Sequence, residues 1–146
     1  MLPQLKILFV LLTLFISSAA FADLAIIGHP DSDTGDLDIQ SARKLFLGER
    51  KSFPSGNYAK PMNHAVGSPD RKTFFSLVMN MPESSYKRHW KRKISTGIAH
   101  VPAELDSHKE VLLSVAGTRG SIGYIDASKV DDTVKVLMTI KDYKKI

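Results

Sequence analysis

The chain has 146 residues, of which 43% are apolar and 24% are charged, a balance typical of one folded domain and not of a disordered chain. It contains no cysteine, which excludes a disulfide scaffold, a metal site built on cysteine ligands and a thiol nucleophile. The formal net charge of +5 favours anionic partners without identifying one.

Residues 1–22 have the pattern of a secretory signal peptide. Lys6 is the only charge before the apolar run 7–16, and the small-x-small sequence Ala20-Phe21-Ala22 follows it. A run this short suits a cleaved leader, since roughly 20 apolar residues are needed to span a bilayer. We expect cleavage after Ala22, with an uncleaved anchor as the alternative, and one domain over residues 23–146. An exported chain without cysteine suits the periplasm.

Strand and helix signals alternate after the leader. The apolar run Leu24–Gly28 predicts a buried strand, and Asp38 is a suitable N-cap for a helix that ends at Gly48. Residues 59–63 predict a short strand, which Pro61 confines to a sheet edge. The apolar face of the helix is expected to consist of Ile39, Ala42, Leu45 and Phe46.

The clearest helix start lies at Gly67-Ser68-Pro69-Asp70-Arg71. Ser68 can cap the first amides, Pro69 suits the first helical position, and Asp70 is favourable against the helix dipole. The buried stripe that follows is expected to contain Phe74, Phe75, Val78 and Met81.

A second helix, from Pro82 to Gly97, combines aromatic and basic residues. Tyr86, Trp90 and Ile94 recur every four residues and predict a buried face, with the basic residues of segment 87–93 on the solvated face. Basic residues among aromatic ones are also typical of surfaces that bind nucleic acid or anionic membranes. Export and the helical spacing argue against nucleic acid, so an anionic partner or a membrane surface remains the alternative.

The last third of the chain completes the fold class. Ser107 and Glu110 form a capping box for a helix that ends at Gly117. Strands are expected at residues 121–125 and 134–139. Strands separated by helices predict an α/β fold, a single lobe with a central mixed sheet flanked by helices. The buried residues of this last helix are expected to be Val111, Leu112 and Val115.

The helix start at Gly67 and Ser68 is also the best candidate for a binding site. Free backbone N–H groups, the positive end of the helix dipole and a hydroxyl together make an anion site, and Arg71 one turn later adds a charged fork. A capped helix without a ligand is the alternative.

Other catalytic and metal-binding patterns fail. The aspartates of segment 31–38 lack the glycine and the closing glutamate of a calcium loop. Two S-x-x-K matches, at residues 41–44 and 84–87, have no accompanying motif, and G-x-S-x-G and H-E-x-x-H are absent from the sequence. We therefore expect no catalytic residues, no metal and no cofactor.

Several motifs, in order, resemble those of the periplasmic phosphate-binding proteins of phosphate ABC transporters. They are Leu45-Phe46-Leu47-Gly48-Glu49, Gly67-Ser68 opening a helix with Phe74-Phe75, a helix with Trp90 that ends near Thr96-Gly97, and Arg119 to Asp126 with its Gly120 to Tyr124 strand. The resemblance covers almost all of residues 24–139, and the small members of the group are the most similar.

The resemblance implies a type II periplasmic-binding-protein fold, in which two α/β lobes close on an oxyanion. It places the phosphate contacts at the Gly67 turn, from Ser68, Asp70 and the Arg71 amide. The chain is long enough for one lobe. It departs from the family where Asn63 to Val66 replace an arginine-bearing segment, where Pro69 replaces a small residue, and where Asp70 adds a carboxylate.

The expected function is binding of an inorganic oxyanion, phosphate first, in connection with an ABC transporter permease or another inner-membrane protein. The alternative is a non-catalytic periplasmic accessory or sensor-partner module that has lost ligand binding. Whether two copies pair as a homodimer to rebuild a two-lobed cleft is left open by the sequence.

Overall fold

The structure, a computed structural model, describes residues 23–97 and 100–142, so the expected signal peptide lies outside the described residues. Within them, one five-stranded sheet has the order β3-β2-β4-β1-β5. β1 is antiparallel to β4 and β5, while β2 is parallel to β3 and β4, which confirms a mixed sheet. The strands are β1 (Leu24–Gly28), β2 (Lys60–His64), β3 (Ala103–Leu105), β4 (Ser121–Asp126) and β5 (Lys135–Ile140).

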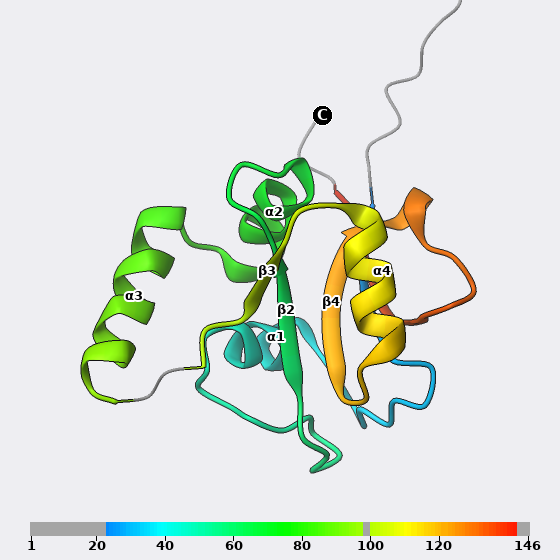
Figure 1. Ribbon diagram of the computed structural model, residues 1–146, viewed down its shortest axis with the longest axis horizontal. Helices are drawn as coiled ribbons and strands as arrows, with labels where there is room; N and C mark the ends of the chain where they lie inside the picture. The colour runs from blue at the N-terminus through cyan, green and yellow to red at the C-terminus, as the bar shows by residue number, and fades with distance from the viewer. Residues whose placement is uncertain (1–22, 98–99, 143–146) are drawn as a thin grey trace, which may run out of the picture.

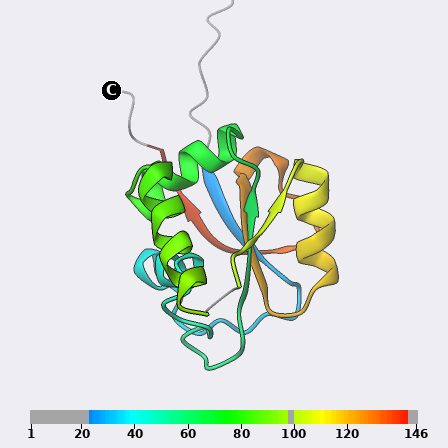
Figure 2. The same cartoon turned by 60° about the vertical axis from the view of Figure 1, so that its left-hand side comes forward.

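Helices cover both faces of this sheet (Figures 1 and 2). α1, α2 and α3 lie on one face and α4 on the other. α2 continues into a π-helical turn, η1, and a short 3-10 turn, η2, follows β4. The bounds are α1 (Ile39–Phe46), α2 (Pro69–Phe74), η1 (Phe75–Met79), α3 (Glu83–Ser95), α4 (His108–Gly117) and η2 (Ala127–Lys129).

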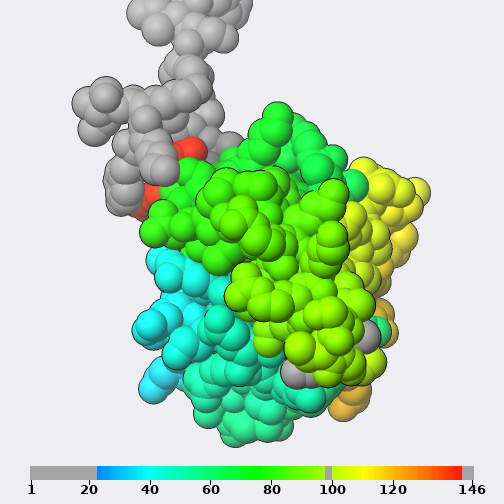
Figure 3. Space-filling view, turned by 90° about the vertical axis from the view of Figure 1, so that its left-hand side faces the viewer, coloured from blue at the N-terminus to red at the C-terminus, as the bar shows by residue number. Residues whose placement is uncertain are grey.

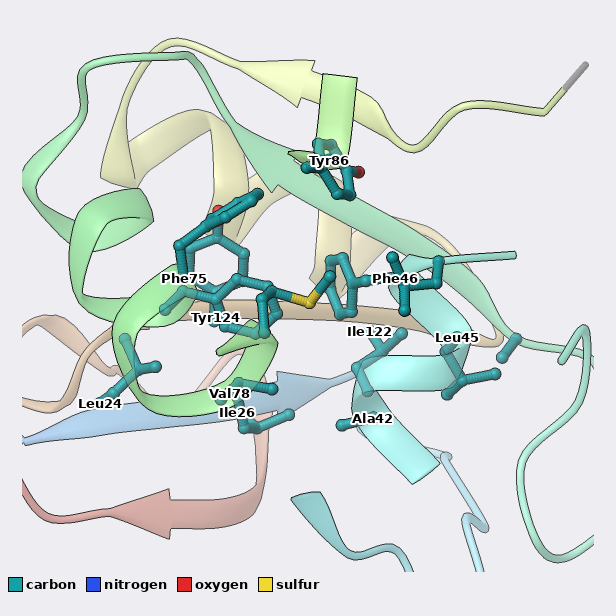
Figure 4. Packing of buried hydrophobic residues seen from close by; sticks show 14 of the residues in the cluster. Leu24, Ile26, Ala42, Leu45, Phe46, Phe75, Val78, Tyr86, Ile122 and Tyr124 are labelled. Carbon is teal, nitrogen blue, oxygen red and sulfur yellow. The ribbon is translucent and has the colours of Figure 1, made fainter. Parts of the chain in front are cut away.

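Alternation along β1 divides the core into two clusters. Leu24 and Ile26 face α1, α2 and α3, whereas Ala25 and Ile27 face α4, because successive side chains of a strand point to opposite faces. The larger cluster is rich in aromatic rings, and Figure 4 shows its packing. Phe74 and Tyr124 stack there with their ring centroids 3.8 Å apart.

The N-caps predicted for three helices are confirmed. Asp38 accepts a hydrogen bond from the Ser41 amide at 2.7 Å, and Ser107 accepts one from the Glu110 amide at 3.1 Å. The Glu110 carboxylate closes back on the amide of Asp106 at 2.8 Å, one residue before the cap. The third cap, Ser68, belongs to the candidate site.

The prediction that Pro61 confines its strand to a sheet edge is wrong, because β2 lies between β3 and β4. The amide of Lys60 donates to the Gly120 carbonyl on the β4 side, so the nitrogen of Pro61 faces the opposite side. β3 pairs with β2 only from Met62 onward. Pro61 therefore sits where β2 has one neighbour, and its missing N–H costs no ladder hydrogen bond.

Three apolar residues are less buried than expected. Ile39 is 37% exposed, and Met81 and Leu112 are half-buried.

Two further details differ from the expectation. β3 was not predicted, because it is short and mostly exposed and is defined by its pairing with β2. Ile94, expected in the buried face of α3, is 50% exposed, although Tyr86 and Trp90 are buried as predicted. Among residues 23–97 and 100–142, no helix has the length and apolar character that a membrane crossing requires.

Candidate functional site

The candidate site lies where β2 ends and α2 begins. Gly67 has a φ of +90°, with open space where a Cβ would stand, and this turns the chain from the strand into the helix. Ser68 follows as the N-cap, with its Oγ accepting from the Arg71 amide at 3.4 Å. Ser68 is half-buried, and a hydroxyl that accepts one hydrogen bond still has its own O–H to donate.

Asp70, in the first turn of α2, is engaged by the neighbouring elements. Its side chain accepts two hydrogen bonds at Oδ2, from Nε2 of His108 at 2.6 Å and from the amide of Asp126 at 3.0 Å. Asp70 is only 8% exposed. Oδ2 thus joins α2 to the start of α4 and to the end of β4, and this oxygen has a structural role.

Arg71 is 2% exposed, and its guanidinium is surrounded by acceptors. Nε and Nη2 donate to the two carboxylate oxygens of Glu83 at 2.6 and 2.9 Å. Nη1 donates to the His64 carbonyl at 2.7 Å and to Oε1 of Glu104 at 3.0 Å. The charged fork that the sequence offers to an anion is therefore occupied by two carboxylates.

Two aromatic rings lie close to the guanidinium of Arg71. Its central carbon lies 5.0 Å from the ring centroid of Phe75 and 5.5 Å from that of Tyr86. Burial lowers the pKa of Arg71, but the hydrogen bonds to Glu83 and Glu104 outweigh it and hold the pKa above its ordinary value. Arg71 therefore stays charged, with one positive charge facing two negative ones.

A buried polar network lies beneath the turn. Nε2 of His64 contacts the Tyr124 carbonyl at 2.6 Å. The backbone amide of His64 donates to Oδ1 of Asn63 at 3.0 Å. The Tyr124 hydroxyl also donates to Oδ1 of Asn63, whose Nδ2 donates to the Tyr86 hydroxyl at 3.3 Å. Burial lowers the pKa of His64 and raises the pKa of both tyrosines.

Gly67, Ser68, Asp70 and Arg71 lie in one turn because they are almost consecutive in the chain, but the side chains of Asp70 and Arg71 are bound by other residues. Sequence reasoning missed Glu83 and Glu104, which arrive from α3 and β3. It also missed the buried network under the turn. Asn63 and His64 follow the buried Met62 at the end of β2, and buried polar side chains of this kind need hydrogen-bond partners.

The remaining polar features lie elsewhere. The basic residues of segment 87–93 lie on α3. They are exposed, except for His89 and Lys93, which are half-buried, whereas Tyr86 and Trp90 on the same helix are buried. Within the described part of the chain, no group of three or more histidine, aspartate or glutamate side chains is arranged to hold a metal ion.

No family model matches this chain, but several solved structures are similar to it. A phosphate ABC transporter substrate-binding protein from Clostridium perfringens, solved with bound phosphate, is 20% identical with a TM-score of 0.62 over 80% of this chain and 45% of its own. An ABC-type phosphate transport receptor from Vibrio cholerae is 16% identical (TM-score 0.63, 81% and 47%). PstS from Borrelia burgdorferi is also 16% identical (TM-score 0.60, 80% and 47%).

The fold is that of one lobe of a periplasmic binding protein. The chain spans about half the length of the solved structures it matches, which agrees with a single lobe. The similar structures are described as phosphate transport proteins. At this level of identity the similarity concerns the fold.

Proposed function

We propose that this chain is an exported, non-catalytic binding-protein lobe that takes an inorganic oxyanion, phosphate first, at the Gly67–Ser68 turn. In this proposal residues 1–22 are a cleaved signal peptide and residues 23–146 form the periplasmic domain. Its membrane partner is an ABC transporter permease or another inner-membrane protein. Nothing in the similar structures supports pairing of two copies, so we do not propose a homodimer.

The observation that carries the proposal is the capped turn in this fold. The Ser68 hydroxyl and the amide of Asp70 are donors at the positive end of a helix, and a phosphate is bound by a protein of similar fold. The next donor, the Arg71 amide, is shared with Ser68 Oγ at 3.4 Å. Pro69 contributes no N–H, so the contacts come from the residues on either side of it.

Arg71 has a positioning role in this account. Its amide contacts Ser68 Oγ, and its guanidinium binds the carbonyl of His64 at the end of β2. The turn is therefore held from both sides by one buried residue. Glu83 and Glu104 neutralise the charge of Arg71, so binding relies on hydrogen bonds more than on net charge, and we expect a modest affinity.

A second candidate function is favoured by that same neutralisation. In this lobe Arg71 is paired with two carboxylates, and Asp70 has a structural role. Such a lobe is also suited to be a periplasmic accessory or sensor-partner module without a ligand. The two candidates differ in one measurable property, which is saturable binding of phosphate.

The deciding experiment is calorimetric titration of the purified chain with phosphate, with sulfate as competitor at matched ionic strength. We expect saturable binding that prefers phosphate and weakens about tenfold or more in Ser68→Ala, since a hydrogen bond to a charged group contributes roughly 1.5–3 kcal/mol.

The matched control is Ser107→Ala, which removes an equivalent N-cap from α4 and leaves the turn intact. An equal loss of phosphate affinity in both variants would mean that Ser68→Ala acts through helix stability and not through a contact with phosphate. Absence of binding in the unmodified chain would leave the accessory module as the function.

A further inference from the structure

A groove runs along the molecule between α3 and the edge strand β3. Its volume is about 630 Å³, and Figure 3 looks onto the side of the molecule formed by α3. The aromatic rings of Tyr86 and Trp90 contribute to its lining, with Val66, Ile94 and Val101 around them. β3 pairs with β2 on one side only, so no strand of the described sheet closes the groove on the other side.

Exposed apolar side chains are concentrated in this groove. The described part of the chain exposes seven large apolar residues, and three of them line it. They are Val66, Ile94 and Val101, at 66%, 50% and 42% exposure. Scattered exposed apolar residues are ordinary on a soluble protein, whereas a cluster in a groove marks a contact surface.

Charge divides the rim of the groove. Lys87 and Lys91 stand on α3 and form no ion pair with a described residue, while Glu83 at the start of α3 and Glu104 in β3 are held by Arg71. Trp90 and Val101 also line a second, neighbouring hollow of about 410 Å³. This hollow is lined by three basic side chains and a histidine, Arg50, Lys51, Lys60 and His100, and no carboxylate of the described residues lines it.

The spacing of the free charges suits an extended chain. Lys87 and Lys91 are four residues apart on one helix, about 6 Å along its axis. Alternate residues of an extended chain are separated by about 6.6 Å. From Glu83 to Ile94 the groove runs about 16 Å, which about five extended residues would span.

We propose that this groove binds an extended peptide segment of a partner protein, in which apolar residues alternate with acidic ones. The apolar side chains cover Val66, Ile94 and Val101, and the carboxylates meet Lys87 and Lys91. The acidic end of the segment lies in the basic hollow. This surface adjoins the Gly67–Ser68 turn at Val66 and Arg71, but it gives the lobe a protein partner through contacts other than those proposed for phosphate.

The test uses a short fluorescent peptide in which leucine and glutamate alternate, titrated with the purified chain by fluorescence anisotropy. We expect saturable binding that is weakened about tenfold or more by the double variant Ile94→Ser with Val101→Ser. Leu113→Ser is the control, because Leu113 is 64% exposed on α4, on the opposite face of the sheet. All three positions are exposed, so the variants keep the fold.

Charge is tested on the same helix. Lys91→Gln should weaken the peptide several-fold and reduce the salt dependence, whereas Arg92→Gln, which removes the same charge beside the groove, should not. Peptides with lysine in place of glutamate, or serine in place of leucine, should not bind.

Three outcomes would overturn the proposal. They are no saturable binding of the leucine–glutamate peptide, equal weakening by Leu113→Ser, and equal binding of the lysine peptide. If the groove variants instead abolish binding to vesicles rich in phosphatidylglycerol while the peptide does not bind, the surface recognises lipid and the proposal is wrong. Ser68→Ala leaves peptide binding unchanged, so this result is separate from the fate of the phosphate proposal.

Discussion

The guanidinium of Arg71 meets the carboxylate of Glu83 through two hydrogen bonds, from Nε to Oε1 at 2.6 Å and from Nη2 to Oε2 at 2.9 Å. This pair joins the first turn of α2 to the first turn of α3. A two-point contact fixes the orientation of a guanidinium as well as its distance. The arrangement therefore governs both the stability of the lobe and the charge that the Gly67–Ser68 turn presents.

Removing Arg71 should destabilise the protein. Breaking a fully buried ion pair costs roughly 3–5 kcal/mol, but the side chains of Glu83 and Glu104 are 39% and 47% exposed and can be rehydrated. We therefore expect Arg71→Met to lower the free energy of unfolding by about 2–3 kcal/mol in urea denaturation. Arg88→Met, at an exposed position of α3, should change it by less than about 0.5 kcal/mol. Equal effects would contradict a structural role for Arg71.

Releasing Arg71 from one carboxylate should strengthen phosphate binding. Glu104→Gln removes a negative charge 3.0 Å from Nη1 of Arg71 and leaves the pair with Glu83 in place. We expect the phosphate affinity to rise about fivefold, as for one charge interaction near a protein surface. Asp132→Asn, an exposed carboxylate in the loop before β5, is the control for net charge. A similar rise in both variants would remove Arg71 from the account of binding.

The buried imidazole of His64 should make stability depend on pH. Burial lowers the pKa of His64 below its ordinary value of 6.5, against the opposing effects of the Tyr124 carbonyl and Asp70. The unfolded chain then takes up a proton below about pH 6.5, before the folded chain does. The free energy of unfolding should therefore fall as the pH drops from about 7 to about 5.

His64→Gln tests this dependence, because an amide can keep the hydrogen bond to the Tyr124 carbonyl and does not titrate. Urea denaturation at several pH values should show a flatter profile for this variant between about pH 7 and about pH 5. A slope that persists undiminished would assign the pH dependence to other groups.

Gly120, which directly precedes β4, should not tolerate a side chain. Its φ is +75°, and a Cβ there would stand 2.6 Å from the carbonyl oxygen of Tyr58. Gly56 has a φ of +93° with nothing within 4 Å. Gly120→Ala should therefore cost about 1–3 kcal/mol more than Gly56→Ala, since both variants carry backbone strain and only one adds a clash. Thermal or urea unfolding of the two variants would reveal the difference, and equal costs would contradict it.

Local signals explain how much of the fold could be predicted from the sequence. The caps at Asp38, Ser68 and Ser107 act over three residues, so a short segment of sequence is enough to predict each helix start. β3 and the interior place of β2 depend on pairing between segments about forty residues apart, which no local pattern encodes. These are the two features of the sheet that the sequence does not predict correctly.

The same limit applies to the candidate site. The sequence suggested Ser68 and Arg71 from the helix start, but Glu83 and Glu104 lie 12 and 33 residues beyond Arg71. In the sequence both glutamates look like ordinary surface charges. Only the approach of α3 and β3 to α2 shows that they share one guanidinium, and that changes the expected electrostatics of the turn.

The most direct test of the central claim is an NMR titration of the ¹⁵N-labelled chain with phosphate at constant ionic strength. The account predicts that the amide signals of Gly67, Ser68, Asp70 and Arg71 shift together along one saturable curve, and that sulfate reproduces the shifts only at higher concentration. Two results contradict the account. One is the absence of shifts in this turn, and the other is shifts in segment 87–93 that rise linearly with phosphate concentration, as general ion binding would produce.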